Sequence, residues 1–194
     1  MIEGFWQAVA ILGTITGALL GGFWRFLRAV ESNKKRYQND AKAMRSLVLS
    51  SELVPQIISL MDKVEREKNI DPTASIEEIL SRRTFAKPVE DIAKSATKTI
   101  EVDSLYFKII DHGFKCAHDL LILAPLPVIS VIWLYAYDGE LTQPLIFLSC
   151  AIVFYLVAGS IKIIRDILKY TSAIRLFIEK DNEIRFGKRS QQAR

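Results

Sequence analysis

The chain has 194 residues, of which 50% are hydrophobic and 25% are charged, and its formal net charge is +4. These averages suit an ordinary soluble domain, but residues 4–24, 120–137 and 141–161 contain no charge at all. At ~1.5 Å per helical residue, each stretch is long enough to cross a hydrocarbon core about 30 Å thick. A water-soluble globular protein is therefore excluded. The predicted fold is an all-α integral membrane protein with three transmembrane helices.

The basic residues predict the orientation of these helices. All 26 Lys and Arg residues lie in residues 25–119 and 162–194, and Lys and Arg are retained on the cytoplasmic side of a membrane. We therefore expect a multipass protein of the cell inner membrane, with its N-terminus outside and its C-terminus in the cytoplasm. The predicted segments are an external N-terminus (1–3), transmembrane helix 1 (4–24), a cytoplasmic helical domain (25–119), transmembrane helix 2 (120–137), an external turn (138–140), transmembrane helix 3 (141–161) and a cytoplasmic helix with a basic tail (162–194).

Glycines in the first predicted span recur every four residues, at Gly13, Gly17 and Gly21. On a helix this spacing forms a groove where another backbone can approach closely. Gln7 and Thr14 lie beside the groove and give it a weakly polar edge. The pattern predicts a glycine zipper that joins copies of the chain into a homo-oligomer, which would line a pore. The alternative is that the groove packs against another span of the same chain.

A cluster of basic residues follows the first span. Such side chains attract anionic lipids of the inner leaflet, so membrane lipids are expected partners here. The cluster consists of Arg25, Arg28, Lys34, Lys35 and Arg36. Residues 25–119 as a whole carry 17 basic and 15 acidic residues, a near balance that argues against a nucleic-acid-binding face. No specific nucleic-acid partner is expected.

Local signals divide the cytoplasmic domain into helices. Pro55 should end or kink a helix, and Asp71 with Pro72 should interrupt the helical pattern. Ser75, followed three residues later by Glu78, matches a capping box that begins a helix. Pro88 suits the first position of the next helix.

A juxtamembrane helix precedes the second span. His112, Cys116 and Asp119 lie at i, i+4 and i+7 on one face of it, a pattern weakly suggestive of zinc binding. Their ordinary interpretation is a set of polar residues at the lipid headgroups, and nothing supplies a fourth ligand. We therefore predict neither a metal ion nor another cofactor.

Two prolines, Pro125 and Pro127, interrupt the second span. A span that began at Pro125 would be too short to cross the bilayer, so the helix should pass through both prolines and kink, leaving backbone carbonyls without donors. One interpretation is a hinge or a carbonyl-lined site. The other is a static kink near the cytoplasmic interface, where water satisfies those carbonyls.

The third span is expected to run on into the cytoplasm as a helix. Apolar residues continue there at helical spacing: Ile164, Ile167, Leu168, Thr171, Ile174 and Ile178. Two other segments, 99–109 and 175–187, are ambiguous, and either is a candidate for a small β element.

The sequence also excludes several functions. No Walker loop, GxSxG, HExxH or paired CxxC motif is present, so an enzyme is not expected. The predicted spans hold no charge or histidine, which proton relays, ion-coupled transporters and voltage sensors require. The leading hypothesis is a channel or membrane-disrupting effector gated by its cytoplasmic domain, of the kind used in bacterial antiviral defence or toxin systems. The alternatives are a non-conducting anchor that recruits a cytoplasmic protein partner, and an immunity protein against a pore-forming toxin.

Overall fold

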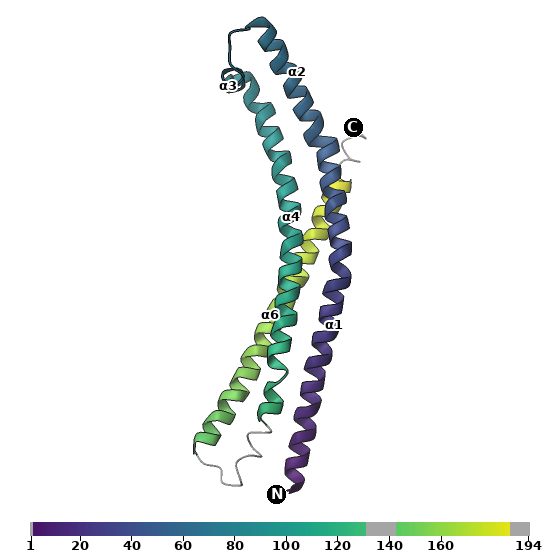
Figure 1. The fold of residues 1–194 in the computed structure, drawn as a ribbon, viewed down its shortest axis with the longest axis vertical. Helices are drawn as coiled ribbons and strands as arrows, with labels where there is room; N and C mark the ends of the chain where they lie inside the picture. The colour runs from purple at the N-terminus through teal and green to yellow at the C-terminus, as the bar shows by residue number, and fades with distance from the viewer. Residues whose placement is uncertain (1, 131–142, 187–194) are drawn as a thin grey trace. The chain divides into compact units, whose positions relative to one another are not determined.

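A computed structural model describes residues 2–130 and 143–186 (Figure 1), and the residues it describes contain helices and no strand. Its elements are α1 (Ile2–Val48), η1 (Leu49–Leu53), α2 (Val54–Ile70), α3 (Ile76–Ser81), α4 (Arg83–Leu123) and α6 (Gln143–Phe186). The β element expected at 99–109 is wrong, because these residues lie inside α4. Residues 175–186 likewise belong to α6, and residue 187 lies outside the described residues.

The chain divides into two compact units. Unit 1 comprises Met1–Lys35 and Lys108–Ile174, and unit 2 comprises Arg36–Phe107 and Arg175–Arg194. The helices α1, α4 and α6 each contribute residues to both units. Each unit is therefore built from three long helices, and η1, α2 and α3 belong to unit 2 alone.

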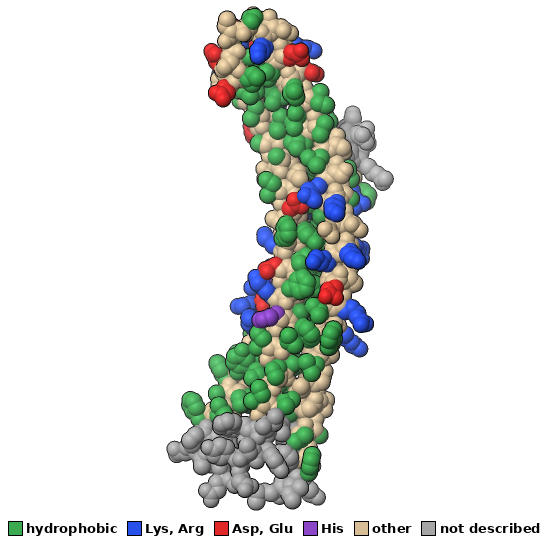
Figure 2. Space-filling view, viewed as in Figure 1, with side chains coloured by type: hydrophobic (Ala, Val, Ile, Leu, Met, Phe, Trp, Pro, Cys, Tyr) green, Lys and Arg blue, Asp and Glu red, His purple; other side chains and the backbone are tan. Residues whose placement is uncertain are grey.

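Three helices are long and apolar enough to cross a membrane. Their most apolar windows have mean hydropathies of 1.4 near the N-terminus, 1.2 in the helix that includes α4 and 2.1 in α6. Only 0% and 6% of the first and third windows are fully buried within the protein, so most of their apolar side chains keep an exposed surface. Figure 2 shows hydrophobic side chains covering the part of unit 1 beside the grey residues.

The core of unit 1 lies between its three helices. Cys116 and Leu123 of α4 are buried with Ile163 of α6, and partly buried residues of α1 pack against this cluster. Further along the unit, the rings of Phe26 and Tyr170 meet edge to face with centroids 5.4 Å apart. These apolar contacts join α1, α4 and α6.

Unit 2 combines a buried apolar core with ion pairs between helices. Its largest buried side chain, Phe177 of α6, meets the ring of Tyr37 of α1 at 5.4 Å. The Arg45 guanidinium lies 3.1 Å from Asp103, which links α1 to α4. A second pair at 3.1 Å, Lys180 with Glu101, links α6 to α4.

Buried residues recur along α4 and α6 at the spacing of packed helices. One series of buried residues in α4 falls every seven residues, and a series in α6 alternates by three and four. The sets are Ser95, Val102, Ile109, Cys116 and Leu123 in α4, and Ile163, Asp166, Tyr170, Ala173 and Phe177 in α6. The predicted continuation of the third span as a helix is confirmed, but its predicted stripe faces outward: Ile164 and Leu168 are 59% and 64% exposed.

Pro55 changes the type of helix and does not end the helical path. The five residues before α2 form a π-helix, closed by a hydrogen bond from the Val54 amide to the Leu49 carbonyl. Pro55 has no N–H for the carbonyl four residues earlier, that of Ser51. The hydroxyl of Ser51 donates to the Leu47 carbonyl. The predicted disturbance of the helix therefore takes the form of one wider turn.

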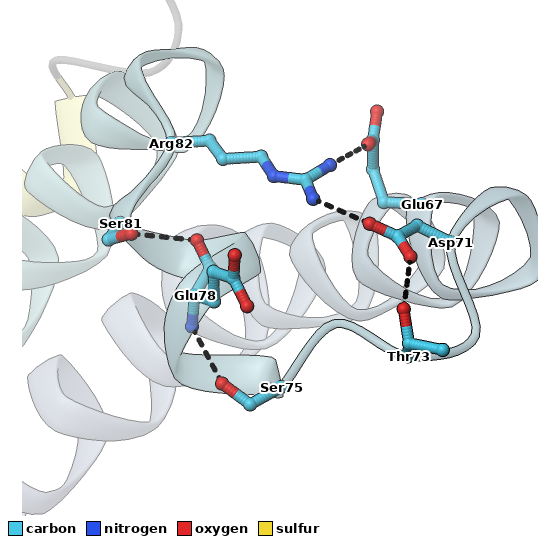
Figure 3. A network of polar contacts seen from close by, with 7 residues as sticks. All are labelled: Glu67, Asp71, Thr73, Ser75, Glu78, Ser81 and Arg82. Atoms are coloured by element: carbon cyan, nitrogen blue, oxygen red, sulfur yellow. Dashed lines mark hydrogen bonds and ion pairs between the residues drawn. The ribbon is translucent and has the colours of Figure 1, made fainter.

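A compact corner joins α2 to α4 (Figure 3). The predicted break at Asp71 and the predicted cap at Ser75 are both confirmed: α2 ends at Ile70, and the Glu78 amide donates to the Ser75 hydroxyl at 3.1 Å. The predicted role of Pro88 is wrong. It lies inside α4, which begins at Arg83 because the corner packs one turn earlier, with Phe85 buried against Ala74 and Ile79.

Candidate functional site

The predicted glycine groove lies on an uncovered face of α1. A Cβ atom added at Gly13, Gly17 or Gly21 would meet no atom of the described residues within 4 Å, apart from the helix's own backbone. Gln7 and Thr14 are also exposed, and the Thr14 hydroxyl donates to the Ala10 carbonyl of its own helix at 2.8 Å. The described helices of the same chain therefore leave this groove open.

Two other glycines lie where a neighbouring helix packs closely against them. A Cβ atom at Gly113 would lie 2.8 Å from a Val30 methyl group and 3.1 Å from the Tyr170 ring. At Gly159 it would lie 2.5 Å from a Leu123 methyl group. These two glycines allow the helices of unit 1 to approach one another, and the sequence did not predict either contact. Their isolation from other glycines gave no pattern to detect.

The two prolines disturb α4 where the sequence predicted. The helix ends at Leu123, Ala124 and Pro125 form a turn, and residues 126–130 are helical again. Pro127 is fully buried, whereas Pro125 is exposed. Pro125 also lines an apolar groove of about 520 Å³ between α4 and α1. The α-helix is therefore interrupted at Ala124 and Pro125, whereas the sequence predicted a helix that runs through both prolines; a hinge at this point stays a prediction.

The predicted lipid-binding cations lie on the surface of α1. Arg25, Arg28, Lys34, Lys35 and Arg36 are all exposed. The Lys34 ammonium lies 6.0 Å from the centroid of the Phe114 ring, at the limit of a cation–π contact. Arg36 lies 4.0 Å from Asp40, one helical turn on. The cluster remains accessible to anionic headgroups.

The residues of the weak zinc candidate do not converge on a metal site. Among the described residues, no group of three or more His, Cys, Asp and Glu side chains is arranged to hold a metal ion. Cys116 is fully buried in the apolar core of unit 1. Burial, together with the nearby carboxylates of Asp166 and Asp119, raises the pKa of its thiol to about 11. Cys116 is therefore a core residue, and its burial does not favour the zinc interpretation.

Asp119 has a different partner, which the sequence analysis missed. Its Oδ1 atom accepts a hydrogen bond from the Lys162 ammonium at 2.8 Å, so the pair joins α4 to α6. Its Oδ2 atom is buried and has no hydrogen-bond partner among the described residues. The signal was available: Asp119 is the last charged residue before the second charge-free stretch, and Lys162 is the first after the third. Two spans joined by a short turn bring such flanking residues to similar depths.

Comparisons of the chain with protein-family models, with curated proteins and with solved structures find no match. The functional argument therefore rests on the residues and geometry described above.

Proposed function

We propose that this protein is a multipass membrane protein that assembles with copies of itself through the glycine face of α1 and acts as a channel or membrane-disrupting effector. The observation that carries the proposal is the open space beside Gly13, Gly17 and Gly21. In the proposed arrangement, the charge-free parts of unit 1 lie in the bilayer. Unit 2 lies in the cytoplasm, because all 26 Lys and Arg residues fall in 25–119 and 162–194, which three membrane spans place on the same side.

The glycine face suits a second copy of the chain better than it suits lipid. Apolar surface gains little by leaving lipid for protein, so membrane helices associate by close packing and interhelical hydrogen bonds. Three aligned glycines allow backbones to approach closely, and the described helices of the chain do not use that space. A symmetric assembly would bring several copies of this face to a common axis.

The same assembly would bring polar groups toward that axis. Gln7 and Thr14 lie on exposed positions of α1 beside the glycines, and they are the polar side chains available to line a pore. A cytoplasmic ligand that changes the interhelical ion pairs of unit 2 would alter the packing of its helices. In the proposed assembly, this change would open or close the pore.

The assembly is tested by replacing Gly17 with Leu in the full chain. We expect the particle mass in detergent, measured by light scattering, to fall to that of a smaller species. Gly22→Leu is the matched control, because Gly22 also has no neighbour within 4 Å but lies about 100° around the helix from Gly21. An unchanged mass in Gly17→Leu would show that the glycine face is not the interface.

Conduction is tested separately with liposomes. Protein that assembles should release a small dye or pass current, and Gly17→Leu should lose this activity while Gly22→Leu retains it. Assembly without dye release or current, with and without cytosolic extract added, would overturn the channel proposal. It would favour a scaffold that recruits a cytoplasmic partner.

A further inference from the structure

A groove runs between α4 and α6 on one side of unit 1. Its larger part, about 270 Å³ and open to the surface, is lined by apolar side chains that include Leu126, Ala151 and Ile152. A smaller hollow of about 60 Å³ adjoins it and reaches the ion pair of Asp119 and Lys162. Ile122 and Tyr155 line both parts, so the two form one groove with an apolar end and a charged end.

The charged end presents a cation outward. The Lys162 side chain is 54% exposed, whereas the Asp119 side chain beneath it is only 11% exposed. Asp119 accepts one of the three N–H bonds of the ammonium group, which leaves the others free to meet a ligand. The hydrogen bond from Lys162 to Asp119 also raises the pKa of Lys162 and keeps it charged. The buried carboxylate thus holds the ammonium at the mouth of the groove.

This arrangement differs from the basic cluster on α1. Arg25, Arg28 and their neighbours are exposed side chains that all come from one helix. Lys162 is held from beneath by the buried Asp119 carboxylate, at the charged end of the groove. Burying Asp119 with one oxygen unpaired costs free energy. In this position its other oxygen holds the Lys162 ammonium at the mouth of the groove.

We propose that this groove binds a phospholipid, with an acyl chain between α4 and α6 and the phosphate on Lys162. The proposal rests on the membrane insertion argued above. A phosphate matches the outward ammonium, and basic pockets between membrane helices on the cytoplasmic side are known to hold lipid headgroups. An acyl chain matches the apolar lining. The small side chain of Ala151 and the close approach of the helices at Gly159 shape the channel between them.

The test is lipid binding to the full chain in detergent, measured by native mass spectrometry. The probes are phosphatidylglycerol and a diacylglycerol with the same acyl chains but no phosphate. We expect the wild-type protein to retain phosphatidylglycerol at least about tenfold better than diacylglycerol, a ratio equivalent to ~1.4 kcal/mol. Lys162→Ala should lose this preference. Lys162→Arg should keep it, as should Arg165→Ala, which removes an exposed cation from α6 outside the groove.

A second variant guards against misfolding, because Lys162→Ala leaves the buried Asp119 carboxylate without its partner. Ala151→Trp fills the apolar end and leaves the ion pair intact. Its control, Val153→Trp, adds the same ring at an exposed position that does not line the groove. Ala151→Trp should weaken phosphatidylglycerol binding, and Val153→Trp should not.

Equal binding of the two lipids by wild type, or wild-type binding by both Lys162→Ala and Ala151→Trp, would overturn the groove proposal. Membrane fractionation and particle mass report separately on the proposed function. A protein that remains in the membrane fraction as an oligomer but fails the lipid test would leave that function standing and remove only the lipid site.

Discussion

At the residue scale, glycine has two different roles in these helices. Gly113 and Gly159 lie where helices of unit 1 approach one another, whereas Gly13, Gly17 and Gly21 face open space. The regular spacing of the second group made it visible in the sequence. The first group could not be predicted, because a lone glycine in a helix does not reveal whether a neighbouring helix lies against it.

The contrast predicts opposite effects of the same substitution. Gly113→Ala places a methyl group 2.8 Å from Val30, whose branched side chain cannot easily move aside. We expect it to destabilise the protein by about 1–3 kcal/mol. Gly17→Ala meets no described neighbour and should not lower the stability of the chain, since alanine favours helix over glycine. Thermal unfolding in detergent measures both, and equal melting temperatures for the two variants would contradict the packing at Gly113.

The pair of Asp119 and Lys162 is another residue-scale feature beyond the sequence analysis. Both residues border charge-free stretches of the sequence. Their contact depends on the relative register of α4 and α6, which periodicity within one helix does not contain. Asp119 was instead grouped with residues of its own helix, and this produced the zinc candidate.

At the element scale, the sequence predicted helices better than it predicted their faces. The cap at Ser75, the break at Asp71 and the continuation of the third span are all confirmed. The apolar spacing of α6 did not identify its buried face, because the helix carries apolar residues on two sides. Its buried side includes the charged residue Asp166, which interrupts the apolar pattern on that side. The outward side includes Ile164 and Leu168.

The corner between α2 and α4 allows a matched test at this scale. Ile79 of α3 is fully buried with Ala74 and Phe85, whereas Ile76 of the same helix is 52% exposed. Ile79→Ala should destabilise the corner by about 2–5 kcal/mol, and Ile76→Ala should change it by less than about 1 kcal/mol. Hydrogen exchange of the segment from 60 to 90, followed by mass spectrometry, should show faster exchange for Ile79→Ala only.

Similar exchange in the two variants would show that α3 is not packed as described.

Acid should loosen the same corner. A hydrogen bond from Thr73 and the neighbouring Arg82 guanidinium hold the pKa of Asp71 below its ordinary value of 3.8. The stabilising charge is therefore present above that value, and it is lost as the pH falls through the lowered pKa.

At the scale of the whole molecule, the composition predicted an all-helical chain with three long apolar helices, and this is confirmed. Charge-free length is a property of the sequence alone, so it needs no tertiary information. The division into two units was not predicted, because α1, α4 and α6 each enter both and no loop marks the boundary. The predicted boundaries followed the charges, whereas the units follow helix packing.

The proposed orientation predicts which cysteines a membrane-impermeant maleimide will label. Cys116 should not react in the native protein, because it is buried and its raised pKa of about 11 leaves little thiolate. Ser46→Cys, at an exposed position of unit 2, should react only when the inner face is accessible. Inverted and right-side-out vesicles provide the two measurements, and a background that carries both Cys116→Ser and Cys150→Ser removes any signal from the two native cysteines.

Labelling of Ser46→Cys in right-side-out vesicles would show that the orientation is the reverse of the one proposed.

The Cys116 thiol adds a pH dependence of its own to the stability of the protein. It stays protonated in the fold until about pH 11, but in the unfolded chain it ionises near 9.0. Its contribution to stability is therefore complete below pH 9 and is lost as the pH rises to 11.

The π-helix before α2 has a consequence for how chains of different length can share this fold. Its wider turn holds one more residue than an α-helix would over the same rise. On one side of it Met44 and Val48 are buried; on the other, Gln56 and Leu60 are partly buried while Ile58 and Met61 face outward. A chain lacking Ser50, and with a residue other than proline at position 55, would have an uninterrupted α-helix here with both inward faces still in phase. An alignment gap at this position would therefore record a change of helix type within one architecture, and the lengths of the surrounding helices would be unchanged.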